Sequence, residues 1–276
     1  MASKSEKVVA GVKTLVADLM ERVMNRVLVD DPFKVDKHRA AKPLYAALVP
    51  DEIFKGSHFE RRFVTPFGRV WEQLAFLAAK NGIGNAELQK SITGNIPEER
   101  LNRIAQVLRN LEHPAKGKKK IKPNWGKELS FVLEGKGELI PTTVITDIYV
   151  KDDSQNKTLA FEIKAPLPNS DQTKVSKEKV LKLYAMEPRI ISDAFFVLPY
   201  NPYGKRENYG WSFPKRWFDM IEDDVVLIGG EFWDLLGGAG TYDLFIKEIN
   251  KLGKKYKDRI YREYLGIEPG DNIFNL

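Results

Sequence analysis

The stretch of residues 143–166 limits the fold more than any other part of the chain, because it has the pattern of two strands joined by a polar turn. Strand residues two apart point to the same face. Glu162 and Lys164, on the second strand, therefore project together, whereas the apolar residues around them point towards a core. Asp147 lies on the first strand. The stretch predicts a polar face with two carboxylates and one ammonium, backed by an apolar face.

Periodic apolar patterns surround this strand pair. Three-and-four spacing predicts helices over residues 7–28, 67–79, 97–111, 174–187, 211–221 and 242–264, and short apolar runs predict strands over 192–200 and 224–230. The order predicts an α/β fold around a mixed central sheet. We expect a mostly helical N-terminal part over residues 1–112, packed on an α/β core with C-terminal helices over 113–276, together one compact domain.

The net charge of the chain indicates which class of binding partner to expect. The chain has 276 residues, a formal net charge of +6 and a pI near 9.2. A basic balance favours a polyanion, with nucleic acid first, although many basic proteins bind none. The sequence has no cysteine, which excludes disulfides and thiolate zinc sites and fits the cytoplasm. It has no apolar run of the roughly 20 residues needed to cross a bilayer, and the interrupted N-terminus is not typical of a secretion signal.

Residues 113–127 form a Lys- and Gly-rich segment around Trp125. Such a segment suits either a loop that follows a phosphate backbone or a solvated connector at the border of the two parts. The sequence does not separate these readings.

Two carboxylates beside a lysine have a simple chemical use. Asp147 and Glu162 supply the hard oxygen ligands that Mg²⁺ prefers, and the carbonyl of Ile163 is a candidate third ligand. A bound metal would polarise a phosphodiester and lower the pKa of a water. Lys164 would orient that water, help to deprotonate it if its own pKa is depressed, or stabilise the transition state. An exposed edge with a cross-strand ion pair explains the same pattern.

A second Glu-x-Lys, at residues 134–136, lies between glycines without a strand pattern and is set aside. Glu72 lies four residues after Gly68 on a predicted helix and is a candidate to approach the metal from the side; a solvated helix carboxylate is the alternative.

Three segments of the chain resemble the PD-(D/E)xK nucleases, in particular the TdeIII-type type II restriction endonucleases. Residues 147–186 carry the Asp, the Glu-x-Lys, a Pro-Asn-x-x-Gln stretch and a basic helix. Residues 59–79 resemble a Glu-Arg-x-Phe segment with its following helix, and residues 225–238 a Gly-x-Glu-Phe-Trp element. Thr146 stands where the superfamily name has Pro.

The resemblance implies a restriction-endonuclease-like core: a mixed sheet flanked by helices. It implies a homodimer that cleaves double-stranded DNA at a short sequence, GGNCC-like, with Mg²⁺ or substituting Mn²⁺, and leaves 5′-phosphate and 3′-hydroxyl ends. A cognate DNA methyltransferase is then expected in the same host. The candidate catalytic residues are Asp147, Glu162, Lys164 and Glu72, the metal ligands Asp147, Glu162 and Ile163, and the DNA contacts Arg61, Asn169, Gln172, Lys174 and Lys177.

Two rival functions remain open at this point. One is a structure-selective repair nuclease or junction resolvase on the same core, which would cut only branched DNA. The other is a basic DNA-binding module whose carboxylates merely pair with lysines and which would show no cleavage.

Overall fold

The computed structural model describes residues 4–113, 121–152 and 154–270. The chain forms two compact units, Met1–Leu74 with Asp243–Leu276, and Ala75–Tyr242. The expected boundary at residues 112–113 lies inside the second unit. Residues 114–120 of the Lys- and Gly-rich segment lie outside the described residues.

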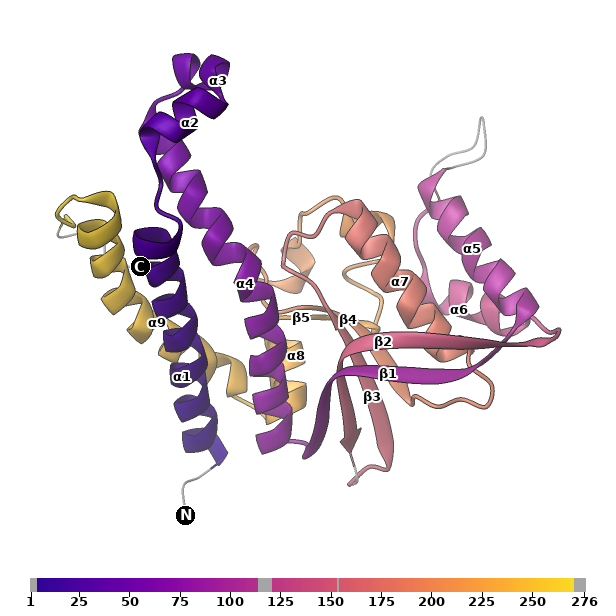
Figure 1. Ribbon diagram of the computed structural model, residues 1–276. Helices are drawn as coiled ribbons and strands as arrows, with labels where there is room; N and C mark the ends of the chain where they lie inside the picture. The colour runs from indigo at the N-terminus through magenta and orange to yellow at the C-terminus, as the bar shows by residue number, and fades with distance from the viewer. Residues whose placement is uncertain (1–3, 114–120, 153, 271–276) are drawn as a thin grey trace. The chain divides into compact units, whose positions relative to one another are not determined.

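The first unit is helical. Its elements are α1 (Lys4–Asn25), η1 (Arg26–Asp30), α2 (Val35–Ala41), α3 (Pro43–Leu48), most of α4 (Asp51–Asn81), most of α9 (Thr241–Arg259) and η4 (Ile260–Leu265). Buried apolar residues recur every three or four positions on α1, which gives the helix one face to pack. The Tyr256 hydroxyl of α9 lies 3.3 Å from the Ala17 carbonyl of α1, so these two helices lie side by side (Figure 1).

The second unit is built on a five-stranded sheet in the order β1-β2-β3-β4-β5 (Figure 1). The strands are β1 (Asn85–Pro97), β2 (Leu139–Asp152), β3 (Lys157–Ile163), β4 (Asp193–Leu198) and β5 (Val226–Ile228). β1, β2 and β3 pair antiparallel, and β3, β4 and β5 pair parallel. This mixed sheet confirms the predicted fold class and the strands of the central stretch.

Strand β1 was not predicted from the sequence. It is an edge strand, and among its apolar residues Ile92, Ile96 and Pro97 are buried while Leu88 is exposed. Because so few positions pack against the core, the strand carries a weak apolar alternation.

Helices cover both faces of the sheet. The predicted helix at 97–111 is α5 (Glu98–Glu112), and the basic helix is α7 (Ser170–Ala185); both pack with α6 (Trp125–Leu133) over one core cluster (Figure 1). On the other side, Phe232 of α8 (Gly230–Gly237) packs against Phe161 of β3 with ring centroids 5.6 Å apart.

The helix expected at residues 211–221 is wrong. Within these residues only one short 3-10 turn forms, η3 (Pro214–Arg216), and another, η2 (Arg206–Asn208), precedes them. The backbone N–H of Asp219 donates to the side chain of Asp223 at 2.8 Å instead of continuing a helical ladder. Among the described residues, no helix is long and apolar enough to span a membrane.

Candidate functional site

The polar face of the central stretch forms where β2 separates from β3. The antiparallel pairing of these strands runs from Asp152 opposite Lys157 to Ile148 opposite Phe161 and stops there. Asp147, the next residue, instead accepts a 2.7 Å hydrogen bond on Oδ2 from the backbone N–H of Ile163. The carboxylate thus replaces a backbone partner, which brings it beside the Glu-x-Lys segment.

Thr146 forms hydrogen bonds with β3 at the end of the β2–β3 pairing. Its hydroxyl accepts from the Phe161 N–H at 3.1 Å and lies 2.9 Å from the Phe161 carbonyl, to which it donates. Thr146 stands where the PD-(D/E)xK pattern has Pro. Its hydroxyl has a structural role, because it bonds to backbone groups of β3 at the point where the two strands separate.

Gln89 faces Asp147 from the other side. Leu88 pairs with Ile148 and Lys90 with Thr146, but no pair is formed between Gln89 and Asp147. Gln89 has a φ of 49°, in the left-handed region that non-glycine residues rarely adopt. Its Nε2 donates to Asp147 Oδ1 at 3.3 Å. Gln89 is not among the residues predicted from the sequence, because β1 was not predicted.

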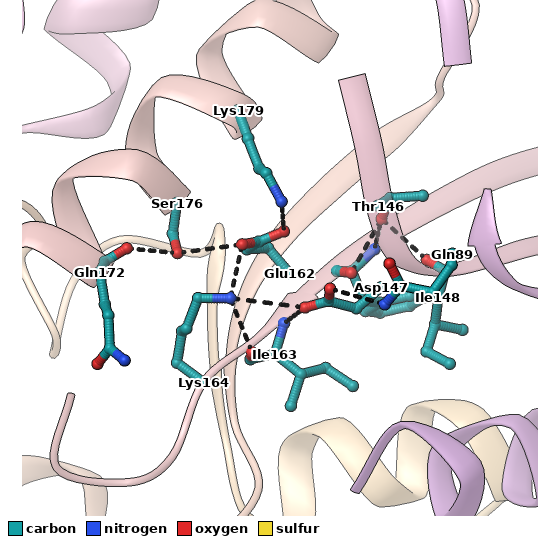
Figure 2. A network of polar contacts seen from close by, with 11 residues as sticks. Gln89, Thr146, Asp147, Ile148, Glu162, Ile163, Lys164, Gln172, Ser176 and Lys179 are labelled. Carbon is teal, nitrogen blue, oxygen red and sulfur yellow. Dashed lines mark hydrogen bonds and ion pairs between the residues drawn. The ribbon is translucent and has the colours of Figure 1, made fainter. Parts of the chain in front are cut away.

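Lys164 lies at the centre of the cluster (Figure 2). Its Nζ is 2.6 Å from Glu162 Oε1, 3.1 Å from the Ile163 carbonyl oxygen and 3.7 Å from Asp147 Oδ2. Three oxygens from three different groups therefore converge on one cation. The predicted association of these four residues is present in the fold.

Glu162 is held by a second lysine. Lys179 of α7 lies 2.8 Å from Glu162 Oε2, and Ser176, one turn earlier, lies 3.5 Å from Oε1 (Figure 2). The Glu162 side chain is 4% exposed. Ser176 and Lys179 were not assigned to the metal site from sequence, although their three-residue spacing on a predicted helix could have indicated one shared face. We name Asp147, Glu162, Lys164 and Lys179 the Asp147 cluster.

The electrostatics of Lys164 favour its charged form. Burial lowers the pKa of this ammonium, but the charges and hydrogen bonds of Glu162 and Asp147 outweigh burial, so its pKa lies above the ordinary value. The condition under which Lys164 would remove a proton from water, a depressed pKa, is therefore not met in this arrangement.

The donor set fits a hard divalent cation. Two carboxylates and one carbonyl are oxygen ligands of the kind that Mg²⁺ takes, and Mg²⁺ commonly uses one or two carboxylates and keeps several waters. Within residues 4–113, 121–152 and 154–270, no group of three or more His, Asp or Glu side chains is arranged to hold a metal. A site here would depend on Asp147, Glu162 and the Ile163 carbonyl, with Lys164 moving aside.

Four candidate DNA contacts lie on or just before α7, and three of them are near its start. Asn169 and Gln172 form a capping box: the Asn169 side chain accepts from the Gln172 N–H at 2.8 Å, and the Gln172 side chain accepts from the Asn169 N–H at 3.2 Å. Both side chains are exposed. Lys174 pairs with Glu112 at 2.5 Å. Their DNA contacts stay predictions, with a helix-capping role for the first two in the free protein.

Lys177 corrects one expectation. It was predicted to contact DNA, but its side chain is 0% exposed. The ammonium pairs with Glu128 of α6, donates to the Trp217 carbonyl and lies 4.7 Å from the centre of the Phe218 ring. A buried and paired lysine cannot reach a phosphate outside the protein, so we withdraw this residue from the DNA contacts.

Glu72 and Arg61 lie on α4 in the first unit. Glu72 is half-buried, and its approach to a metal stays a prediction. Arg61 is exposed and lines a cavity between α4 and the segment before it.

A mixed five-stranded sheet flanked by helices, with two carboxylates and a lysine where two strands part, has the restriction-endonuclease-like fold. A family model described as "Type II restriction endonuclease, HinfI" matches residues 10–253. The chain therefore belongs to the HinfI family of type II restriction endonucleases.

Two relatives from Herpetosiphon aurantiacus are of similar length. The type II restriction enzyme HgiCII is 28% identical over 228 residues, which are 81% of this chain and 82% of the relative. The type II restriction enzyme HgiBI is 27% identical over 227 residues, 80% and 81% of the two chains. The predicted class of type II restriction endonuclease is confirmed at this level, and the family that the comparison names is HinfI in place of the TdeIII type.

Proposed function

We propose that this protein cleaves double-stranded DNA at a short specific sequence by Mg²⁺-dependent hydrolysis of a phosphodiester, with Mn²⁺ as a substitute. The observation that carries the proposal is the convergence of three oxygens, from Asp147, Glu162 and Ile163, on the position of one ammonium. This convergence occurs in a member of a restriction endonuclease family. The same pattern in an ion-paired strand edge would not require the strands to part at Asp147.

The chain's own residues supply binding and charge. Asp147 and Glu162 would hold the metal, with the Ile163 carbonyl as the third protein ligand. A bound Mg²⁺ would polarise the scissile phosphate and lower the pKa of the attacking water. Lys164, in its ammonium form, would donate hydrogen bonds to that water or to a phosphate oxygen and stabilise negative charge in the transition state. In-line attack then leaves 5′-phosphate and 3′-hydroxyl ends.

A plasmid digest with Mg²⁺, followed by run-off sequencing of the ends, tests the proposal. The parent is expected to give discrete fragments whose ends share one short sequence, and Asp147→Ala, Glu162→Ala and Lys164→Ala each to give none while they remain folded by circular dichroism. Equal cleavage by Glu162→Ala would refute the assignment. Cleavage restricted to branched DNA would favour the resolvase, and salt-dependent binding without cleavage the binding module.

The recognition site and assembly belong to the same proposal. A GGNCC-like interrupted palindrome suits a two-fold symmetric dimer, since each half-site meets the same surface of one subunit. The end sequences test the site, and light scattering with and without duplex tests the dimer. Protection of the plasmid by methylation at the mapped site would support a partner methyltransferase, and cutting that ignores methylation there would speak against one.

A further inference from the structure

A cavity of about 480 Å³ lies in the helical unit, outside the Asp147 cluster. It is formed by the end of η1, the loop that follows, α2 and the first half of α4. The Arg39 guanidinium of α2 pairs with Asp51 at 2.6 Å, which fixes α2 to the start of α4. The cavity thus lies between the short helix α2 and the first half of the long helix α4, which this ion pair joins.

The cavity has an aromatic floor. The ring of Phe33 packs against the rings of His38 and His58 with centroids 5.5 Å and 5.7 Å apart, and His38 packs against Phe54 at 4.1 Å. The Nδ1 of His58 is hydrogen-bonded to the hydroxyl of Tyr264, and burial lowers the pKa of His58. Burial therefore disfavours the charged form of His58, and the lysines and arginines of the lining lie around these aromatic rings.

The rim is strongly positive. Its two carboxylates are already engaged: Asp31 pairs with Arg62, and Asp30 accepts from Asn25 at 2.8 Å. By contrast, within the described chain no carboxylate lies within ion-pair distance of four exposed rim cations, which are Lys34, Lys37, Lys42 and Arg61. With Arg62 included, five cations of the lining face two carboxylates, so the cavity has an excess of positive charge that attracts a polyanion.

We propose that this cavity is a second DNA-contact site, which takes phosphodiester phosphates of the duplex backbone. The inference rests on the proposed function in that DNA is the substrate, and it adds a site that binds without regard to base sequence. Neutralising each backbone phosphate releases counterions and contributes roughly 0.9 to the slope of log K against log salt. The four rim cations would anchor the duplex, and the sequence would be read elsewhere.

The test compares two double variants by fluorescence anisotropy with a labelled duplex, without divalent metal so that no cleavage occurs. Lys37→Gln/Arg61→Gln removes two rim cations. Lys247→Gln/Lys254→Gln removes two exposed lysines of α9 in the same unit, neither of which has an ion-pair partner among the described residues. The rim pair is expected to lower the salt slope by roughly 1–2, whereas the α9 pair leaves it unchanged. An unchanged slope in the rim pair, or an equal loss in both, would overturn the proposal.

The histidines give a readout at the cavity itself. The chain has three, and His38 and His58 line the cavity whereas His113 does not. In NMR spectra of the folded rim pair and parent, duplex DNA is expected to shift the ring signals of His38 and His58 in the parent and not of His113. Equal shifts from sodium phosphate at the same phosphate concentration would assign the cavity to free phosphate and overturn the proposal. Because these measurements need no cleavage, their failure is distinguishable from failure of the proposed function.

Discussion

Helix α7 contributes a lysine to each of two charged clusters that differ in how open they are. Lys179 joins the Asp147 cluster, and Lys177 joins Glu128 and Asp223 in what we name the Lys177 cluster. In the first, the Lys164 side chain is 21% exposed and that of Asp147 11%, although Glu162 is only 4% exposed, so the cluster is partly open to solvent. In the second, Lys177 is fully enclosed between α6, α7 and the turn at Trp217.

The pKa directions show what this difference does. Burial lowers the pKa of Lys177 despite the opposing charge of Glu128, and burial raises the pKa of Glu128 despite Lys177. In the Asp147 cluster two carboxylates outweigh burial and raise the pKa of Lys164. In an enclosed ion pair, the attraction between the two charges is offset by the free energy lost when both are removed from water. A partly open cluster keeps its charges available for a metal and a phosphate.

A matched pair of substitutions gives the largest expected separation between the clusters. Glu162→Gln is expected to reduce DNA cleavage by roughly a thousandfold, equivalent to about 4 kcal/mol in the barrier, because it removes a charge from the metal site. Glu128→Gln is expected to retain cleavage while the protein is folded. Initial rates on linearised plasmid measure both. Equal loss of cleavage in the two variants would erase the proposed division of roles.

The next effect concerns stability. Lys177→Met leaves Glu128 buried without its partner, and breaking a buried pair costs about 3–5 kcal/mol. Urea unfolding at pH 7 measures the loss. The double variant Lys177→Met/Glu128→Gln is expected to recover most of it, since residue 128 is then uncharged and Asp223 keeps its hydrogen bonds from the backbone N–H groups of Trp125 and Asp219. If the single variant is as stable as the parent, Lys177 contributes nothing to the fold.

The sequence predicted more of the site than of its supports. The sequence predicts that three site residues share a face, because successive side chains of a strand point to opposite sides. These residues are Asp147, Glu162 and Lys164. The alternation ends at Asp147, however, where Thr146 and the carboxylate replace backbone partners of β3. Such replacements depend on atoms more than ten residues apart, and no local pattern encodes them.

Two further features, the burial of Lys177 and the strand β1, could not be predicted from local sequence patterns. On α7, Lys177 and Lys179 are only two residues apart in one basic run, and their different burial is decided by α6 and Trp217, which approach from other parts of the chain. Gln89 could not be found without β1, and β1 has only a weak apolar alternation because it pairs with β2 along its length while few of its side chains pack against the core. Tertiary contacts, not propensity, decided each case.

A third and smaller effect probes Lys179. This lysine holds the Oε2 of Glu162 without supplying a ligand, so Lys179→Ala is expected to weaken metal binding or cleavage by roughly 10–100-fold, as loss of a supporting contact commonly does. Ca²⁺ titration by calorimetry reads the site without turnover. Lys182→Ala is the control on the same helix, because Lys182 pairs with Glu178. An effect of equal size in the control would mean that α7 acts through general charge.

The smallest effect is a pH dependence that only the enclosed cluster should show. The pKa of Lys177 is lower in the folded protein than the ordinary value of 10.5, so near that pH the unfolded chain binds more protons than the folded one. Stability therefore rises as the pH increases from the folded pKa towards 10.5, by at most about 1.4 kcal/mol per pH unit for one proton. The difference in free energy of unfolding between the parent and Lys177→Met should move in favour of the parent across alkaline pH. A difference that stays flat would show that enclosure does not disfavour the ammonium, and the contrast between the two clusters would then rest on geometry alone.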